Sequence, residues 1–371
     1  MAANTKLFAP LQVGNMKLSN RVAMAPLTRF RANDEHVHQD IAKEYYVQRA
    51  APVPGTLIIT EATPVSARAG NYPNVPGIYT DAQIKAWKDI VDAVHAKGSY
   101  IYLQMWALGR TASAETLKAE TGLALKSSSA VAMSDNSPKP EELTEEEILG
   151  LISDYASGAK NAIEGAGFDG VEIHGANGYL IDQFTQDTCN KRTDKWGGSV
   201  ENRSRFGLEV TKAVVKAVGA DKVGLRISPW SSFQGMGMED PVPQFTHFVN
   251  ALKEYKLAYL HVVESRITGN ADVEATGKID FAIDAWANTS PILLAGGFKP
   301  DSAQQAVEQY KDKDVVIVFG RYFISTPDLV YRLREGIDFT PYDRDSFYIP
   351  HSTKGYTDYP YSEKYQKEAK L

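Results

Sequence analysis

The chain reads Phe168-Asp-Gly-Val-Glu-Ile-His174-Gly-Ala-Asn177-Gly-Tyr179 near its centre. The first half of this stretch is an apolar run of the kind that forms a buried strand. Three hydrogen-bonding side chains, His174, Asn177 and Tyr179, then follow within six residues, where the strand gives way to a loop. In a repeated β/α architecture, the carboxyl end of a strand is the catalytic rim. The stretch therefore predicts a β/α fold that carries its chemistry at the strand ends.

These three side chains suit the activation of a conjugated carbonyl. His174 and Asn177 offer two N–H donors that can hold one substrate oxygen, and Tyr179 is a neutral hydroxyl that can deliver a proton. The structural alternative is a histidine packed in the core and an asparagine in a turn. No metal site is expected, because no second histidine or carboxylate stands at ligand spacing from His174.

Similar apolar runs recur along the chain with helical stretches between them. They are rich in Val, Ile and Leu without polar alternation, as expected when helices cover both faces of a parallel sheet. The eight expected strands are Val22–Ala25, Thr56–Glu61, Tyr100–Met105, Gly170–His174, Val223–Ile227, Tyr259–Val263, Ile292–Ala295 and Val315–Phe319. The expected helices are Ala82–Ala96, one that opens on a capping box at Thr144–Glu147, Arg205–Val218 and Ala303–Tyr310. Eight such units favour a closed (β/α)₈ TIM barrel over an open doubly wound sheet.

We expect one domain over residues 1–371, with two segments that break the β/α rhythm. Residues 107–143, after the third strand, form a long connection rich in Ser, Ala and Pro. A structureless connection of that length is uncommon in a compact domain unless it has a function such as a lid. Residues 341–371 follow the last helix as an aromatic tail.

The composition excludes several classes of protein. The 371 residues carry a net charge of −6 and a pI of about 5.7, which argues against a nucleic-acid surface or a polybasic membrane anchor. The single cysteine, Cys189, excludes an intramolecular disulfide and a cysteine-ligated iron–sulfur cluster. The N-terminal sequence lacks the apolar core of a secretory signal, and no run approaches the ~18 apolar residues of a membrane span. We expect a cytoplasmic, soluble monomer or homodimer that works on small molecules.

Polar side chains also end the first and third strands. Thr28 closes Met24-Ala-Pro-Leu-Thr28, and it either caps the strand or offers a hydroxyl to a cofactor. Gln104 and Trp106 end the third strand. The Gln104 amide can pair with the edge of a heterocycle such as the pyrimidine ring of a flavin, and Trp106 can wall a substrate pocket. A core amide and a packing tryptophan are the structural alternative.

Arg226 places a charge inside the apolar run Gly224–Pro229. A cation in a buried strand is costly without a partner. One interpretation is a salt bridge to an interior carboxylate. We favour the other, a cation beside the edge of a cofactor where reduction builds negative charge, because polar residues on barrel strands tend to face the site.

Glycines end the last two strands, at Gly296-Gly297 and at Gly320, which Arg321 follows. Glycines let backbone N–H groups approach a phosphate, and an arginine can clamp it. In (β/α)₈ barrels the phosphate site often lies after strands seven and eight. The alternative is a pair of tight turns. No G-x-G-x-x-G motif follows the first strand, so a Rossmann dinucleotide domain is not expected.

Together with further segments, these residues resemble the old yellow enzyme family of flavin-dependent ene-reductases over nearly the whole chain. The resemblance is to fungal members, including the ergot-alkaloid branch, which shares Thr60–Thr63. The matching segments are Leu7–Leu11, Ala25–Arg29, Gln104–Trp106, Phe168–Phe184, Trp196–Ser199, Glu201–Arg203, Phe319–Leu329, Phe347–Tyr348 and Gly355–Pro360.

The resemblance implies a (β/α)₈ barrel with non-covalent FMN that NADPH or NADH reduces. By position, it implies a flavin-ring set (Pro26, Thr28, Ala62, Gln104 and Arg226) and a phosphate set (Gly296, Gly297, Gly320 and Arg321). It makes His174 and Asn177 the donors to the substrate oxygen and Tyr179 the proton donor, in a pocket lined by Tyr72, Trp106, Phe347 and Tyr348. The chain departs from the family at Ala62 and Val318, where many members have glycine. The Ala62 methyl group narrows the site, and Val318 bears on one backbone approach at the phosphate turn.

The implied reaction has two steps. NAD(P)H reduces FMN, and the C=C bond of an α,β-unsaturated aldehyde, ketone or related activated alkene is reduced next. One alternative is a (β/α)₈ lyase or aldolase that binds a phosphorylated substrate without flavin, against which the lack of an obvious Schiff-base lysine on a strand weighs. The other is an idle binder or isomerase of the same fold, against which the proton donor Tyr179 weighs.

Overall fold

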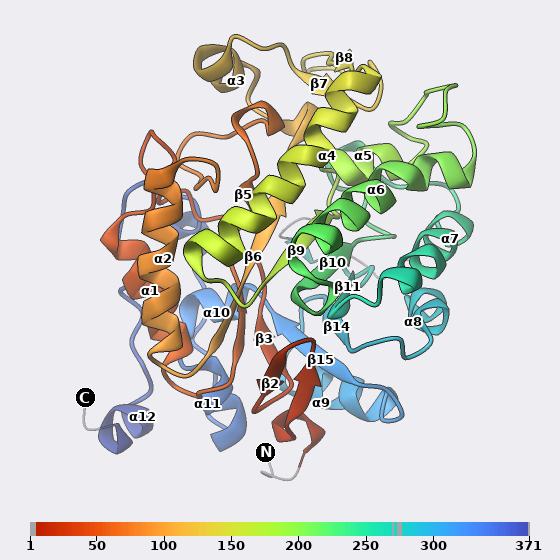
Figure 1. The fold of residues 1–371 in the computed structure, drawn as a ribbon. Coiled ribbons are helices and arrows are strands. Elements are labelled where there is room, and N and C mark those ends of the chain that lie inside the picture. The colour runs from red at the N-terminus through yellow and green to blue at the C-terminus, as the bar shows by residue number, and fades with distance from the viewer. Residues whose placement is uncertain (1–4, 269–270, 273–276, 370–371) are drawn as a thin grey trace.

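Eight parallel strands close into a barrel in the computed structural model of this protein, which describes residues 5–268, 271–272 and 277–369. Neighbouring strands pair in the order β4-β3-β15-β14-β11-β10-β9-β6, and a pairing between β4 and β6 closes the ring. The eight strands are β3 (Val22–Met24), β4 (Leu57–Ile59), β6 (Tyr100–Trp106), β9 (Gly170–Gly175), β10 (Val223–Ile227), β11 (Tyr259–Val263), β14 (Ile292–Ala295) and β15 (Val315–Phe319). Helices surround the ring (Figure 1), which confirms the predicted (β/α)₈ barrel.

The sequence located these strands because an apolar run buried on both faces is a strong signal. The predicted bounds of β10, β11, β14 and β15 are correct, and β6 and β9 each run one residue further than predicted. The prediction was less accurate for β4, which was expected over Thr56–Glu61. This strand ends at Ile59, where the hydroxyls of Thr60 and Thr63 begin to donate to the carbonyl of Glu61.

The four predicted helices are present with shifted ends: α2 (Asp81–His95), α4 (Glu145–Lys160), α6 (Val200–Val218) and α9 (Pro300–Gln309). The predicted capping box opens α4, where Thr144 Oγ1 accepts from the Glu147 N–H at 3.2 Å and Glu147 Oε2 accepts from the Thr144 N–H at 2.8 Å. Helix α6 begins at Val200 rather than at Arg205. Ser199 Oγ caps it by accepting from the N–H of Asn202.

The other helices and the short strands were not predicted from the sequence. The further helices are α1 (Asp40–Ala50), α3 (Ala114–Thr121), α5 (Leu180–Thr185), α7 (Val242–Leu252), α8 (Asp280–Trp286), α10 (Arg321–Ser325), α11 (Leu329–Glu335) and α12 (Glu363–Glu368), with a π-helical turn over Asn161–Ala166. The further strands are β5 (Thr63–Pro64), β7 (Lys126–Ser127), β8 (Glu141–Glu142), β12 (Ile267–Thr268) and β13 (Ala271–Asp272). Every residue of α5 is buried, the polar Asp182, Gln183 and Thr185 included, so its sequence does not show the apolar and polar faces by which a surface helix is recognised.

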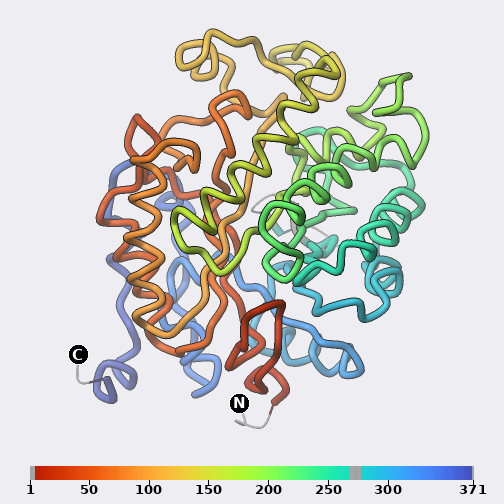
Figure 2. The backbone as a smooth tube through the Cα atoms, viewed as in Figure 1, coloured from red at the N-terminus to blue at the C-terminus, as the bar shows by residue number. Residues whose placement is uncertain are grey.

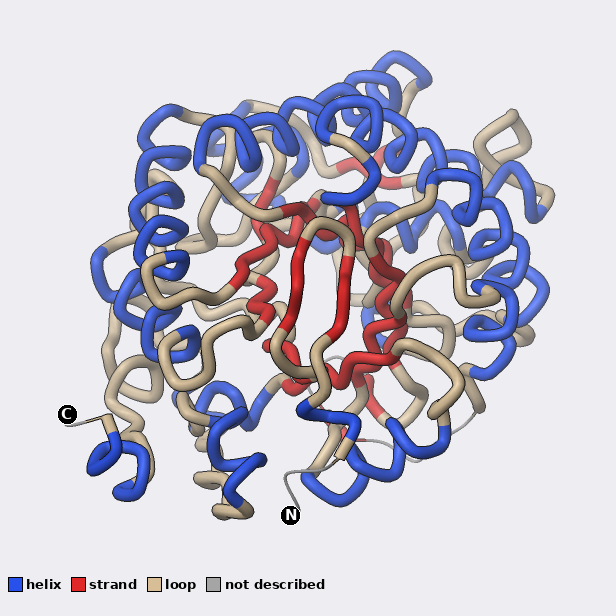
Figure 3. The backbone as a smooth tube through the Cα atoms, turned by 60° about the horizontal axis from the view of Figure 1, so that its bottom comes forward, coloured by secondary structure: helices blue, strands red, loops and turns tan. Residues whose placement is uncertain are grey.

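An N-terminal hairpin, also not predicted, closes the bottom of the barrel. Strands β1 (Leu11–Val13) and β2 (Met16–Leu18) pair antiparallel and bury one face. Their buried side chains join the apolar side chains that fill the barrel interior. Figure 3 shows the ring of strands from this end, with the hairpin lying across it. A ligand is therefore expected at the opposite end, where the strands have their carboxyl ends.

Residues 107–143 form a long excursion at the top of the barrel, and this excursion contains α3, β7 and β8 (Figure 2). Arg110 ties the excursion to the loop after β10, because its guanidinium donates to the carbonyls of Gln234 at 3.0 Å and Val131 at 3.1 Å. No residue between 107 and 143 lines the cavity at the carboxyl ends of the strands. A role as a lid therefore stays a prediction.

The aromatic tail docks on the barrel through two buried arginines. Arg31 donates to the carbonyl of Phe347 at 2.7 Å, and Arg29 donates to the carbonyls of Phe347 at 3.1 Å and Gly355 at 2.7 Å. These bonds hold Phe347 at the open end of the barrel. The last two residues of the predicted tail, 370 and 371, lie outside the described residues.

Gly224 on β10 makes room for the Tyr259 ring inside the barrel, because a Cβ at position 224 would lie 2.2 Å from Cζ of that ring. We expect Gly224→Ala to lower the free energy of unfolding by about 1–3 kcal/mol, as overpacking of a close-packed core does. Urea unfolding measures the change. Adding Tyr259→Leu should recover part of the loss, and an unchanged unfolding midpoint in Gly224→Ala would contradict the packing argument.

Candidate active site

A cavity of about 790 Å³ opens at the carboxyl ends of the strands. Every residue that the sequence and the resemblance placed at the site lines this one cavity. The cofactor set is Pro26, Thr28, Ala62, Gln104, Arg226, Gly296, Gly297, Gly320 and Arg321, and the catalytic and substrate set is Tyr72, Trp106, His174, Asn177, Tyr179, Phe347 and Tyr348. The structure thus brings them together, while the role of each remains a prediction.

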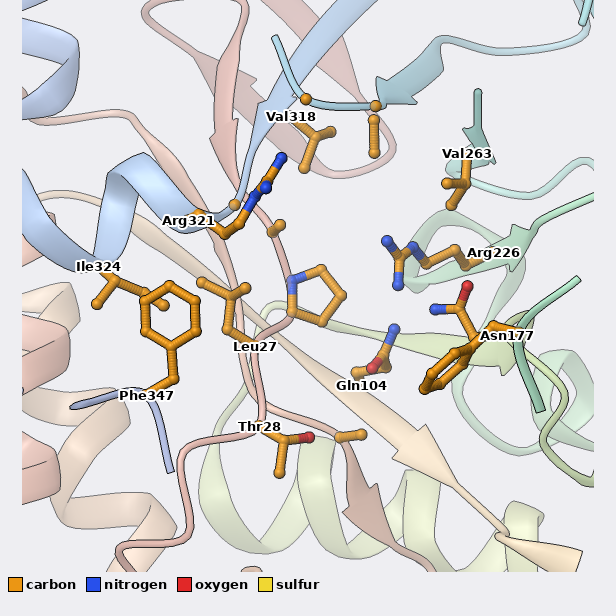
Figure 4. A pocket seen from close by; sticks show the side chains of 18 of the residues that line it. Leu27, Thr28, Gln104, Asn177, Arg226, Val263, Val318, Arg321, Ile324 and Phe347 are labelled. Atoms are coloured by element: carbon orange, nitrogen blue, oxygen red, sulfur yellow. The ribbon is translucent and has the colours of Figure 1, made fainter. Parts of the chain in front are cut away.

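The cavity has a polar end and a cationic end. Figure 4 shows Arg226, Gln104 and Asn177 grouped at one end, with Arg321 at the other. Apolar side chains, Leu27 among them, form much of the remaining lining, and Lys299 and Asp272 also belong to it. This division matches an elongated ligand with a polar edge, an apolar body and an anionic terminus.

His174, on β9, is neutral and its tautomer is fixed. The backbone N–H of Ala176 donates to His174 Nδ1 at 3.3 Å, so the ring proton is on Nε2. Burial, Arg226 and His261 lower the pKa of His174 far below its ordinary value. At neutral pH the imidazole therefore presents Nε2–H as a donor without a positive charge.

Asn177 is held by its backbone, which leaves its side-chain amide facing the cavity (Figure 4). Its φ of 57° lies in the left-handed region, which asparagine tolerates better than most residues. Its N–H donates to Ser228 Oγ at 2.7 Å, and its carbonyl accepts from Gln234 Nε2 at 2.7 Å. Gln234, which also lines the cavity, was not predicted, because the loop that carries it shows no local motif.

Tyr179 completes the polar group. Its ring packs edge-on against His174 and Trp106, with ring centroids 4.8 Å apart in both pairs. Burial and the nearby Tyr72 raise the pKa of Tyr179 well above its ordinary value. The hydroxyl therefore keeps its proton at neutral pH and gives it up only to a strongly basic atom.

Arg226 does not form the salt bridge to an interior carboxylate that was one of its two interpretations from the sequence. Among the described residues no carboxylate pairs with it, and its buried Nε has no hydrogen-bond partner. Burial lowers the pKa of Arg226, and the negative charge of Glu172 opposes that effect. The guanidinium faces the cavity (Figure 4), where a ligand acceptor would satisfy it.

The cationic end combines a glycine turn with Arg321. Gly296 and Gly297 have φ values of 155° and 65°, and a Cβ at Gly296 would lie 2.7 Å from the Cβ of Glu264, so this turn requires glycine. Arg321 forms a bidentate ion pair with Asp272, at 2.8 and 2.6 Å. Asp272 was not predicted, because no sequence motif marks it. A phosphate at this end would meet both the cation and this carboxylate.

Ala62 and Val318, the two departures from the family pattern, also line the cavity. Both are almost fully buried. Each therefore fills space that a glycine would leave open, Ala62 by one methyl group and Val318 by an isopropyl group.

Aromatic side chains form the outer rim of the cavity. Phe30 packs edge-on against Tyr72 and Tyr348, with ring centroids at 6.2 and 5.6 Å. Phe30 was not predicted, although its place two residues beyond Thr28 puts it on the rim. Its φ of 56° is unusual for a bulky residue and costs on the order of 1–3 kcal/mol. The surrounding packing therefore holds this ring over the cavity.

A comparison with protein families shows to which family the chain belongs. Residues 6–339 match the model of the NADH:flavin oxidoreductase / NADH oxidase family. The chain belongs to this family. The resemblance to old yellow enzymes is confirmed, and the lyase alternative without flavin is wrong, because the family is flavin-dependent.

Curated relatives and solved structures match nearly the whole chain. Chanoclavine-I aldehyde reductase fgaOx3 of Penicillium roqueforti (strain FM164) is 60% identical over 98% of both chains. A probable inactive dehydrogenase, easA of Claviceps purpurea (strain 20.1), is 52% identical over 99% of this chain and 98% of its own. The crystal structure of Old Yellow Enzyme from Pichia sp. AKU4542 superposes with a TM-score of 0.90 at 41% identity, over 97% of this chain and 95% of its own.

The cavity fits the FMN that this oxidoreductase family uses with NAD(P)H. The polar end offers the amide of Gln104 and Arg226, whose buried Nε has no partner among the described residues, so it can bind the heteroatoms of a flavin edge. The opposite end offers Arg321 and a turn that requires glycine, which suits a phosphate. The predicted dependence of this enzyme on FMN and NAD(P)H is therefore confirmed by its family. None of the described helices combines the length and apolar character needed to cross a membrane.

Proposed function

We propose that this enzyme reduces the C=C bond of α,β-unsaturated aldehydes, ketones or related activated alkenes. The observation that carries the proposal is the convergence of His174, Asn177 and Tyr179 at one end of the cavity. Two N–H donors and a protonated phenol are what a conjugated carbonyl needs for activation. The name of the fungal aldehyde reductase similar to this chain makes an unsaturated aldehyde the first substrate to test.

The side chains divide the work by their chemistry. His174 Nε2–H and the Asn177 amide would donate to the carbonyl oxygen and draw electrons from the β-carbon. Bound FMN, reduced by NAD(P)H, would supply the hydride. Tyr179 would give its proton to the α-carbon, which is basic enough to take it from a phenol with a raised pKa.

The pocket around these groups fixes the position of the substrate. Trp106 packs against Tyr179, and Tyr72 packs against Trp106 with ring centroids 5.7 Å apart. A planar conjugated alkene would lie against these rings, and Phe347 and Tyr348 would exclude water from the open side. We also propose that the enzyme works in the cytoplasm as a monomer or homodimer.

The test is product identity. The purified enzyme with NADPH and a conjugated aldehyde should yield the saturated aldehyde, which NMR distinguishes from the unsaturated alcohol. Formation of the allylic alcohol would mean that the carbonyl itself is reduced. Absence of both reduced product and net NADPH consumption, over a panel of enals and enones, would favour the idle alternative, to which the names of some relatives point.

We predict that Arg321→Ala weakens FMN binding more than it slows turnover of the FMN-loaded enzyme. A charge-assisted hydrogen bond contributes about 1.5–3 kcal/mol, so the dissociation constant of FMN should rise by roughly 10- to 150-fold. Loss of Arg321 also leaves Asp272 without its partner at 2.8 and 2.6 Å. Flavin fluorescence measures the dissociation constant, with Arg68→Ala as a control, because Arg68 also pairs with a carboxylate, Asp154, at 2.7 Å and does not line the cavity. An unchanged constant in Arg321→Ala would place the phosphate elsewhere.

A further inference from the structure

A group of buried polar side chains lies inside the barrel behind the polar end of the cavity. Its centre is Glu172 on β9, which accepts three hydrogen bonds. The donors are Gln104 Nε2 at 2.8 Å, Tyr259 OH at 3.0 Å and His261 Nδ1 at 2.8 Å. We refer to these four residues as the Glu172 group. Only Gln104 of the four lines the cavity, so the proposed chemistry does not account for the other three.

Glu172 is ionised in spite of its burial. Burial raises the pKa of this carboxyl, but the hydrogen bonds from His261 and Gln104 and the charge of Arg226 outweigh that effect and hold the pKa below its ordinary value. Burial lowers the pKa of His261, so its imidazole acts as a neutral donor. A buried carboxylate is costly, and it persists only where several donors satisfy it. The Glu172 group therefore fixes one negative charge close to the Arg226 cation.

The backbone is shaped to admit these side chains. Gly224 lies beside Glu172 in the register of β10 and β9, and a side chain at this position would collide with the Tyr259 ring. The absence of a Cβ lets Tyr259 cross the interior and reach the carboxylate. The opposite half of the barrel interior is apolar, with Leu293 and Val316 on β14 and β15. Among the described strands, the Glu172 carboxylate and its donors therefore occupy only the side of the barrel formed by β6, β9, β10 and β11.

The first consequence of this arrangement concerns Gln104. Gln104 Nε2 uses one of its two N–H groups on Glu172, so Gln104 can offer a ligand in the cavity its carbonyl oxygen and the second N–H. Glu172 thereby fixes the orientation of the amide, which suits the edge of a heterocycle that carries an N–H beside an acceptor atom. The orientation does not depend on the ligand, because it is fixed from behind by the protein.

The second consequence is electrostatic. Uptake of a hydride adds one negative charge to a flavin ring, and a protein tunes its flavin through the charges beside it. Arg226 favours the added charge, and the Glu172 carboxylate opposes it. An enzyme that must pass the hydride on benefits from this opposition, because it keeps the reduced cofactor a strong donor.

We propose that Glu172 is a positioning residue that orients Gln104 and lowers the reduction potential of bound FMN by offsetting Arg226. The inference rests on the proposed placement of the flavin ring beside Gln104 and Arg226. It assigns a function to three residues, Glu172, Tyr259 and His261, that do not line the cavity.

The test compares the reduction potentials of FMN-loaded variants, equilibrated against a reference dye. Glu172→Gln should make FMN easier to reduce by at least about tenfold in the equilibrium constant, which is a positive shift of about 30 mV for a two-electron couple. Tyr259→Phe removes one donor from the carboxylate and leaves its charge less compensated. It should shift the potential in the negative direction, by about threefold in the equilibrium constant.

A matched control separates charge from stability. Asp328 is another fully buried carboxylate, paired with Arg332 at 2.7 Å, and it does not line the cavity. Asp328→Asn removes a buried charge and should leave the potential at the parent value, even if it lowers the melting temperature. Opposite shifts in Glu172→Gln and Tyr259→Phe, with none in Asp328→Asn, would support the proposal, because a purely structural role does not produce opposite signs.

Other outcomes overturn it. A parent-like potential in Glu172→Gln would do so, and so would shifts of the same sign in Glu172→Gln and Tyr259→Phe. If Glu172→Gln does not fold or load FMN, the sign of the shift in Tyr259→Phe decides alone. Gln104→Leu separately tests the proposed position of the flavin ring beside Gln104. An unchanged FMN dissociation constant in this variant would mean that the ring does not lie there, and it would overturn both that position and the inference. A weakened constant combined with a parent-like potential in Glu172→Gln would overturn the inference alone.

Discussion

Replacing Tyr179 with phenylalanine should slow the reduction of 2-cyclohexenone by roughly 10²–10⁴, the usual contribution of a positioned general acid. The substitution keeps the ring that packs against His174 and Trp106 and removes the proton. Because burial raises the pKa of Tyr179, the parent hydroxyl is protonated over the whole neutral range. We therefore expect the rate of the parent enzyme not to fall through a Tyr179 ionisation between pH 6 and 8.

Stopped-flow kinetics separates the two half-reactions. Reduction of the bound flavin by NADPH should be nearly unchanged in Tyr179→Phe, because hydride transfer to the cofactor needs no acid, whereas reoxidation by the enone should show the full loss. Tyr45→Phe is a suitable control, since its hydroxyl is also buried but Tyr45 does not line the cavity. Enone reduction at the parent rate in Tyr179→Phe would show that solvent or another residue supplies the proton.

His174→Ala should cost roughly 10²–10³ in enone turnover, as the loss of one preorganised donor to a developing oxyanion does. It should also weaken the binding of a phenol, because a phenol oxygen would accept from the same Nε2–H. This second effect distinguishes His174, which holds the oxygen, from Tyr179, which gives a proton.

The fixed tautomer allows a sharper comparison at this position. The Ala176 N–H donates to Nδ1, so only Nε2–H faces a ligand, and a glutamine could restore one N–H donor. His174→Gln should therefore recover part of the phenol affinity that His174→Ala loses, as measured by titration of the flavin absorbance. Equal phenol affinity in His174→Ala and the parent would mean that His174 does not bind the oxygen.

The sequence by itself determined the barrel and the positions of its chemistry. A strand covered on both faces is apolar throughout, so β10, β11, β14 and β15 could be located to the residue. Side chains that follow such strands lie on one rim by the rules of the fold. That is why His174, Gln104 and Arg321 could be assigned to one site before any contact was known. Tyr72 and Phe347 are different, because only the family resemblance placed them there.

Glu172 and His261, like Arg226, are polar residues inside apolar runs that form buried strands. This pattern marks all three as unusual, but the sequence could not show which groups Glu172 and His261 contact. The partners of Glu172 are 68, 87 and 89 residues away along the chain. Which of several inward-facing polar groups meet depends on the closure and register of the barrel, and a local pattern contains neither.

Tertiary structure alone decided the contacts that distinguish this site from a generic barrel rim. It paired Arg321 with Asp272 and bound Gln234 to the carbonyl of Asn177. It also left Arg226 facing the cavity with no carboxylate partner in the part of the chain that the structure describes. The physical reason is the same in each case. Apolar periodicity reports which face of an element is buried, whereas hydrogen bonds and ion pairs depend on where distant elements come to lie beside one another.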